Sequence, residues 1–204
     1  MLKKIGLALL LVLLIAAGLV YYLFYQATSL PDWYTAEAAE APEPAVLPDG
    51  SLAWADAPAK AGATGQRKEL RNFHKKAAKK HPEVAKVIKS SRASFAGGVL
   101  ELGVVADLRN LPQDQLKGDQ AEFFQKVRKT FPSATDREVY IGVEDPAPVF
   151  AGGRIELGPA AELRVGNLSY DLDAAAAKLG MTPAALRAQF NGQIHQLGVN
   201  PPTG

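Results

Sequence analysis

The sequence predicts an α+β fold: an N-terminal transmembrane helix, then an antiparallel sheet built from two duplicated β-hairpin-plus-helix units, with helices packed on one face. Three observations lead to it: an uncharged apolar run near the N-terminus, an acidic Ala- and Pro-rich stretch behind it, and a segment that occurs twice. We expect residues 1–26 to form a cytoplasmic stub and membrane anchor, 27–66 a tether, and 67–204 an extracytoplasmic domain.

The apolar run extends from Ile5 to Phe24 and follows two lysines. Its 20 residues, if helical, rise about 30 Å, the thickness of the hydrocarbon core of a bilayer. The run is longer than the apolar region of a cleaved signal peptide, which is the alternative, and it ends in bulky aromatic residues. We assign six residues to the anchor and its interfacial aromatic belt: Ile5, Phe24, Tyr21, Tyr22, Trp33 and Tyr34.

The lysines before the run keep the N-terminus in the cytoplasm by the positive-inside rule. We therefore expect a single-pass protein of the bacterial inner (cytoplasmic) membrane whose C-terminal domain lies in the periplasm or an equivalent exported compartment. The chain has no cysteine, which excludes disulfides, thiolate nucleophiles and cysteine metal sites. Its formal net charge is only +2, so the chain as a whole is not a polyelectrolyte. Hydrophobic residues make up 48% of the sequence, enough for packing alone to stabilise the domain.

The stretch 35–66 has the composition of a flexible tether, with eleven Ala, four Pro and five acidic residues. Trp54 follows a turn signal at residues 48–50. The alternative therefore stays open that part of this stretch packs on the domain through Trp54.

The charge reverses over residues 67–92, which predict two amphipathic helices broken near His81 by Pro82. This basic segment is a candidate contact surface for anionic lipid headgroups or an acidic partner, and the alternative is a solvated helix face neutralised by the acidic tether. Few aromatic residues accompany the charges, and the segment is exported, so we expect no nucleic-acid partner. The candidate surface consists of Arg67, Lys68, Arg71, Lys75, Lys76, Lys79, Lys80, Lys86 and Lys89.

The repeated segment occupies residues 95–109 and 150–164, and ten of its fifteen positions are identical. In each copy two extended runs flank a Gly-Gly pair, which predicts a hairpin. The strand of the first copy alternates, with Leu100 and Leu102 on an inner face and Glu101 on an outer face. Pro159 in the second copy places that strand at an edge or bends it.

Helices are predicted after each copy. The run 118–131 carries an apolar side rich in phenylalanine, and a second helix ends at Gly180. Thr182 caps a last helix that has Pro183 at its first position.

The sequence offers no motif for catalysis, a metal or a cofactor, and we expect none of these. His74 and His81 lie about 10 Å apart along a helix, too far for one metal ion, and no GxSxG or phosphate-loop pattern is present. An envelope hydrolase would use the duplicated carboxylates Glu101 and Glu156, although cross-strand ion pairs explain them as well. An acyl chain between the apolar hairpin faces and the Phe-rich helix is the other alternative.

The second half resembles the closing segment of the YpmS-like membrane-anchored proteins, which have one anchor, an extracytoplasmic α+β domain and no established activity. The matching positions are Val149, Gly153, Ile155, Leu157, Val165, Gly166, Leu168 and Leu172. The chain departs from the family at Asp171 and Asp173, where the family has proline before the helix. The resemblance implies the same architecture for this chain.

These observations together predict a membrane-anchored, non-catalytic binding or assembly protein, an accessory subunit that docks to a membrane protein complex. A lipid-binding envelope domain is the first alternative, and a hydrolase is the second.

Overall fold

The computed structural model describes residues 25–58, 66–80, 82–110, 118, 122, 125, 129 and 137–202. No helix within these residues is long and apolar enough to cross a membrane. The predicted anchor helix, including Tyr21 and Tyr22, lies outside them, as does most of the predicted Phe-rich helix. The described positions of that helix, 122, 125 and 129, are helical.

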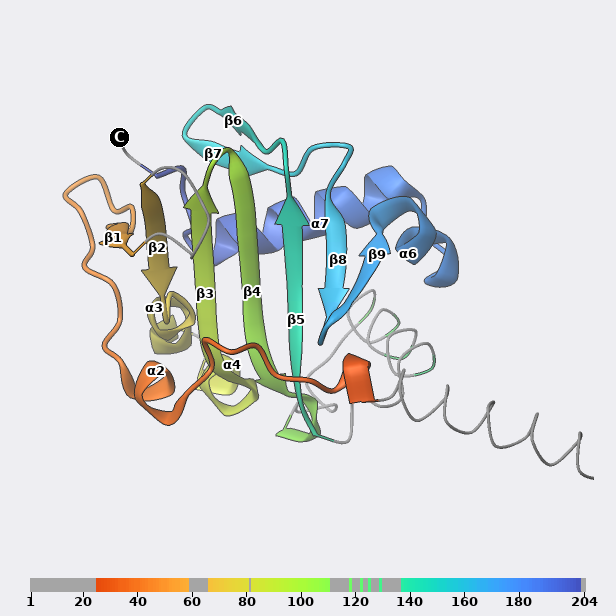
Figure 1. Ribbon diagram of the computed structural model, residues 1–204, viewed down its shortest axis with the longest axis horizontal. Helices are drawn as coiled ribbons and strands as arrows, with labels where there is room; N and C mark the ends of the chain where they lie inside the picture. The colour runs from red at the N-terminus through yellow and green to blue at the C-terminus, as the bar shows by residue number, and fades with distance from the viewer. Residues whose placement is uncertain are drawn as a thin grey trace, which may run out of the picture.

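Seven antiparallel strands form one large sheet in the order β1-β2-β3-β4-β5-β8-β9 (Figure 1). Each neighbouring pair is joined by antiparallel register, so the predicted α+β class with an antiparallel sheet is confirmed. The strands are β1 Ala55–Ala57, β2 Arg67–Arg71, β3 Ile88–Ala96, β4 Val99–Asp107, β5 Glu138–Asp145, β8 Glu162–Val165 and β9 Leu168–Asp171. A separate ribbon pairs β6 Val149–Ala151 with β7 Arg154–Glu156.

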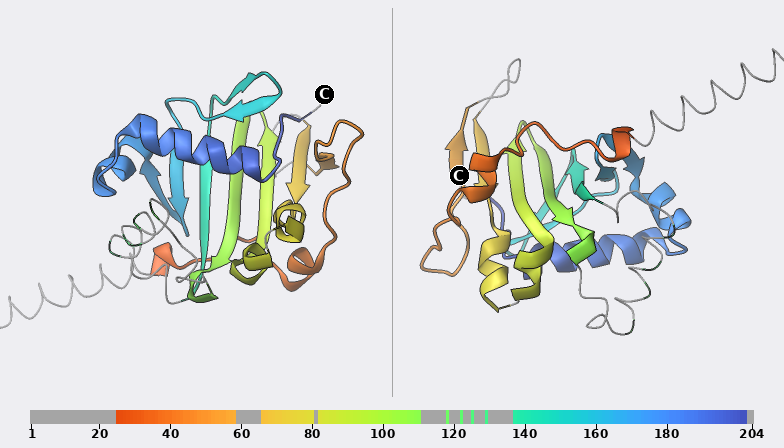
Figure 2. Two further views of the ribbon diagram at one scale, coloured as in Figure 1. Left: turned by 180° about the vertical axis from the view of Figure 1, so that it is seen from behind. Right: turned by 90° about the horizontal axis from the view of Figure 1, so that it is seen from below.

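One face of the sheet is apolar and carries the two helices of the C-terminal part, α6 (Leu172–Lys178) and α7 (Pro183–Gln196). The left panel of Figure 2 shows α7 lying across this face. Leu186 and Ile194 of α7 join Leu100 and Leu102 of β4 in one buried cluster. Thr182 caps α7 as predicted, with its Oγ1 accepting from the backbone N–H of Ala185 at 3.2 Å.

The first repeat is the hairpin that the sequence predicts. Gly97 and Gly98 have φ of 58° and 84°, left-handed values that the turn requires and glycine adopts freely. β4 continues without interruption from Val99 to Asp107, and its leucines are buried while Glu101 lies on the opposite face. The predicted alternation holds from Val99 to Leu102, whereas Gly103, Val105 and Asp107, which have the parity of Glu101, are buried as well.

The second repeat has the same turn but a different strand. Gly152 and Gly153 again have positive φ, yet the strand breaks after Glu156 and resumes as β8 in the other sheet. The buried Asp145 accepts from the backbone N–H of Gly158 at 2.7 Å and from that of Ala147 at 2.9 Å, which folds the chain back on itself. The bend predicted at Pro159 therefore occurs. The two copies share the turn and the register of the three residue pairs beside it, and they diverge after Glu156.

Residues 67–71 form the strand β2, so the prediction of a helix over these residues is wrong. Pairing on both sides explains the difference, because β2 lies between β1 and β3 and every second residue faces the apolar side. The helices begin later, as α3 (His74–Lys80) and α4 (Pro82–Val87), so the predicted division into two helices before Pro82 is observed. Residues 88–92, also expected to be helical, belong to the strand β3, and that part of the prediction is wrong. The 3₁₀ turn η1 (Leu108–Asn110) follows β4.

Much of the stretch expected to be a free tether lies against the sheet instead. We call residues 25–58 the strap; it includes the helix α2 (Ala36–Glu40) and the strand β1. The right panel of Figure 2 shows that its first part crosses the face opposite α7. Leu52 is buried, and Trp54 donates from its indole Nε1 to the carbonyl of Asn200 at 2.9 Å. The docking that the sequence left open for Trp54 is therefore observed.

Asn72 explains why the strap packs. This fully buried residue has φ of 51° and joins β2 to α3. Its Nδ2 donates to the carbonyls of Ala38 and Ala41, at 2.8 and 2.9 Å, while its Oδ1 accepts from Ser90. The last carbonyls of a helix lack partners within the helix, so the domain caps α2 from outside.

Candidate functional site

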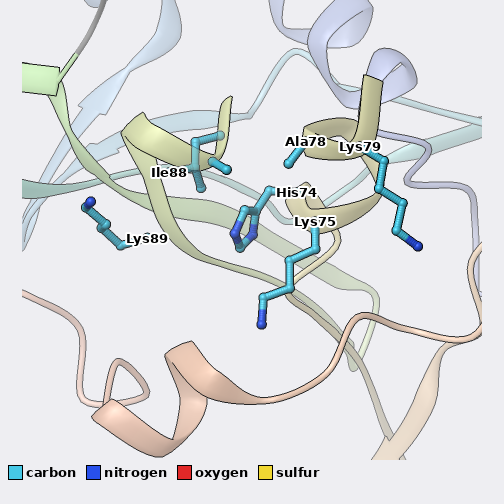
Figure 3. A pocket seen from close by; sticks show the side chains of 7 residues that line it. His74, Lys75, Ala78, Lys79, Ile88 and Lys89 are labelled. Atoms are coloured by element: carbon cyan, nitrogen blue, oxygen red, sulfur yellow. The ribbon is translucent and has the colours of Figure 1, made fainter. Parts of the chain in front are cut away.

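A hollow of about 410 Å³ opens between α3, α4 and the start of β3. Its lining combines three lysines and one histidine with small or aliphatic side chains: His74, Lys75, Ala78, Lys79, Ala85, Ile88 and Lys89. Figure 3 shows the His74 ring between Lys75 and Lys89, with Ala78 and Ile88 above it in that view. The lining contains no carboxylate within the described residues. Three of the seven residues are lysines and three are aliphatic, so the hollow is a basic site with an apolar part.

His74 is held in place by Ser91 of β3. The ring Nδ1 lies 2.9 Å from Ser91 Oγ, and the same hydroxyl oxygen accepts from the backbone N–H of His74 at 3.1 Å. Only 3% of His74 is exposed. Burial, with a smaller contribution from the charge of Lys75, lowers the pKa of His74 from 6.5 to about 4. The imidazole is therefore neutral at physiological pH.

The lowered pKa of His74 predicts a loss of stability in mild acid. Because the unfolded chain takes up a proton on this residue below about pH 6.5 and the folded chain only below about pH 4, the folded state weakens between these values. From pH 7 to pH 5 we expect the free energy of unfolding to fall by about 2 kcal/mol from this group. Urea titration of the full chain in a non-ionic detergent at both pH values measures it.

The control for that experiment is His74→Gln, which removes the titrating group and leaves His81 and His195 unchanged. The variant should lose less stability than the wild type between pH 7 and pH 5, by about the same 2 kcal/mol. An equal pH dependence in both proteins would contradict the assignment.

Several lysines of the candidate surface are engaged by the strap. Lys75 donates to the carbonyls of Ala39 and Ala41 at 3.2 and 2.6 Å, and Lys76 donates to that of Gly50 at 2.7 Å. Lys79 forms an ion pair with Glu43, and Lys68 forms one with Asp56 at 3.0 Å. The acidic strap thus neutralises part of the basic segment, as the alternative interpretation of that segment anticipated. The side chain of Lys80 lies outside the described residues.

Within the described residues, Lys86 and Lys89 form no hydrogen bond or ion pair with the strap. Lys86 is exposed at the end of α4, and Lys89 donates to the carbonyl of Lys86 at 3.2 Å. A carbonyl partner orients an ammonium group without neutralising its charge. Lys89 is half-buried, and its charge also acts on the buried carboxylate of Asp107.

Arg67 and Arg71 belong to a different place, the polar face of the sheet. Together with Arg92 they surround the carboxylate of Glu69, which is only 6% exposed. Arg92 also lies over the ring of Trp33, 5.6 Å from its centroid. The two arginines are therefore part of an ion-pair cluster around a buried carboxylate and not of the surface around the hollow.

The aromatic residues assigned to the membrane interface, Trp33 and Tyr34, contact the sheet. Trp33 packs edge-on against Tyr140 with centroids 5.9 Å apart, and Tyr34 donates to Glu138 at 3.1 Å. The Tyr140 ring fits over a cross-strand glycine pair, Gly103 and Gly142. A Cβ at Gly103 would lie 2.4 Å from that ring, so the glycine of the first repeat provides space for a side chain.

The duplicated carboxylates are not brought together. Glu101 lies on the polar face of β4, opposite Ser94 and Glu144. Glu156 lies on β7 and lines a small hollow of about 150 Å³ with residues of α7, which covers the other face. Glu144 forms an ion pair with Arg164 at 2.6 Å, a cross-strand pair of the kind expected. Among the described residues, no group of three or more His, Asp and Glu is placed to hold a metal ion.

The apolar hairpin face, which was the alternative site for an acyl chain, is part of the buried hydrophobic core. Leu100, Leu102, Leu157 and Leu163 are each at most 7% exposed and pack with α6 and α7. Sequence reasoning missed the hollow because it extended the two predicted helices over residues 67–71 and 88–92, which form β2 and the first part of β3. The signal that could have found it is Asn72, a turn-forming residue within an otherwise helical pattern.

Comparison with known proteins gave no matching family model, no similar curated protein and no similar solved structure.

Proposed function

We propose that this chain is a single-pass membrane protein whose strapped domain is held directly on the extracytoplasmic side of the membrane as a non-catalytic binding module. In this role it is an accessory subunit of a membrane protein complex, with its N-terminus in the cytoplasm. The resemblance to the YpmS-like proteins agrees with that architecture. The alternative proposals are a lipid-binding domain, whose ligand would be a lipid, and a hydrolase, whose ligand would be a substrate.

One observation carries the proposal. The first described residues after the apolar run already contact the domain, since the carbonyl of Gln26 accepts from the backbone N–H of Asn167 at 2.8 Å. Gly166, in the same β8–β9 turn, would place a Cβ 2.3 Å from that carbonyl oxygen. A domain joined this closely to its anchor has a fixed height and orientation at the membrane. It therefore suits a partner in the same membrane better than a distant one.

The opposite end of the sheet then faces away from the membrane and carries exposed apolar side chains. Val149 and Phe150 of the β6–β7 ribbon are 48% and 43% exposed. Figure 1 shows this ribbon at the end of the sheet opposite α4 and η1. We assign this ribbon as the contact point for the partner, because apolar side chains at the centre of an interface supply much of its binding energy.

Topology is tested with single cysteines, because the natural chain has none. We expect Gln193→Cys, on the exposed side of α7, to react with a membrane-impermeant maleimide in intact spheroplasts. Leu2→Cys should react only after the membrane is permeabilised. The reverse pattern, or equal labelling of both, would refute the orientation.

Partner binding is tested by purifying the full chain at native abundance in a mild detergent. We expect a membrane protein complex to copurify, and Val149→Asp to reduce its recovery at least fivefold. Val46→Asp is the matched control, because Val46 is a similarly exposed valine in the strap. A chain that runs alone, or equal recovery with both variants, would count against the accessory-subunit role.

A further inference from the structure

We propose that the lysine-rimmed hollow between α3 and α4 binds the phosphate headgroup of an anionic lipid, with the adjoining apolar part of the lipid against Ala78, Ala85 and Ile88. The position of the hollow at the membrane rests on the proposed function. The chemistry of the hollow itself rests on its lining.

The charge of the lining suits a phosphate. Lys75 and Lys89 donate to backbone carbonyls, which carry no net charge. The charge of Lys89 also acts on the buried carboxylate of Asp107, which is itself paired with Arg109. Lys79 pairs with Glu43 on the strap, and this is the carboxylate that the structure shows bound to a rim lysine. His74 is buried and neutral, so it adds a polar ring without adding charge that a nearby lysine would repel. The described rim is therefore positive, and a phosphate would be attracted to it.

The inner surface of the hollow suits an amphiphile better than a bare ion. Ala78, Ala85 and Ile88 offer it only hydrocarbon, and a free phosphate gains nothing from such contacts. A volume of about 410 Å³ lies within the usual range for small-molecule sites of roughly 300–1,000 Å³. A headgroup with its glycerol unit would fill both parts.

The position of the hollow agrees with a lipid ligand. β2 runs into α3 and α4 runs into β3 at one end of the sheet, and the β8–β9 turn, where the strap begins, lies at the same end. β3 and β8 are three strand positions apart, a distance of roughly 15 Å at the usual strand spacing. A domain anchored through residue 25 thus presents the hollow toward the headgroups beside its own anchor.

The test uses the full chain in a neutral detergent and isothermal titration with three probes: dihexanoyl phosphatidylglycerol, dihexanoyl phosphatidylcholine and inorganic phosphate. We expect phosphatidylglycerol to bind at least tenfold more tightly than either of the others. Lys89→Gln, which removes one rim charge, should weaken its binding three- to tenfold. Ala85→Phe, which fills the hollow without a change in charge, should abolish it. Lys178→Gln on α6 is the matched control and should leave binding unchanged.

A second measurement tests whether the lipid binds at the hollow. The imidazole NMR signals of His74 should shift when phosphatidylglycerol is added to the wild type and to Lys178→Gln, and should not shift in Ala85→Phe. Equal affinity for the two lipids would overturn the proposal, as would inorganic phosphate binding as tightly as phosphatidylglycerol. Because the protein in these titrations is in detergent and not in a membrane, such a failure is separate from a failure of the maleimide test of topology.

Discussion

Asn72→Asp is expected to lower the free energy of unfolding by about 3 kcal/mol and to release α2 from the domain. The amide of Asn72 donates to two carbonyls at the end of α2, and a carboxylate at the same place can donate to neither. A charged group would also be fully buried against two carbonyl oxygens, which adds repulsion and desolvation. Chemical unfolding of the full chain in detergent measures the stability, and limited proteolysis reports the release of α2.

Two further variants make the result specific. Asn72→Gly keeps the left-handed backbone conformation at no steric cost but removes the cap, so it should also release α2. Asn167→Asp adds the same charge at an exposed position and should change stability by less than about 0.5 kcal/mol. If Asn72→Gly leaves α2 protected from protease, the side-chain cap does not hold the strap.

The strap shows where prediction from sequence fails for a physical reason. Residues 35–66 have a composition that cannot form a core of their own, and locally they have the character of a tether. Their partners lie elsewhere in the chain: the donors on Asn72 are 34 and 31 residues from the carbonyls that they cap. A contact between segments so far apart leaves no local pattern, so composition alone predicts a free linker.

The sheet shows the opposite case, since its determinants are local. Alternation of period two in β4 and the glycine pair at 97–98 give the hairpin, its register and its buried face. In the second copy the same residues do not give the same continuous strand, because identical residues need not have identical packing partners. Gly103 accommodates the ring of Tyr140, whereas the equivalent Gly158 donates its N–H to Asp145 and lies beside the backbone of Ala147.

The hollow has features that the sequence predicts and features that it does not. The lysines of the candidate basic surface were visible as a charge run, but three of the residues that line the hollow are Ala78, Ala85 and Ile88, which carry no signal of their own. The break at Pro82 was predictable, and it sets α3 against α4. The strand β2 was not, because Leu70 and Phe73 are three residues apart, which is a helical spacing, and Phe73 lies beyond the end of the strand.

Gly166→Ala is expected to cost about 2–3 kcal/mol and to detach the first residues of the strap. Gly166 has φ of 58°, and a Cβ there would lie 2.3 Å from the carbonyl oxygen of Gln26 and 2.5 Å from that of Ala27. Both are backbone atoms, so the strap itself must move, and the hydrogen bond from Asn167 to Gln26 is then lost. Thermal unfolding measures the cost, and amide hydrogen exchange at Asn167 reports the detachment.

Gly180→Ala separates the clash from the conformational strain. Gly180 has φ of 65°, and a Cβ there would meet nothing within 4 Å, so this variant has only the left-handed strain of about 1 kcal/mol. The excess in Gly166→Ala over Gly180→Ala is therefore the energy of the contact between the strap and the β8–β9 turn. If the two variants lose equal stability and Asn167 stays protected, the chain leaving the anchor is not held on the sheet. The fixed orientation at the membrane, on which the proposed function depends, would then be lost as well.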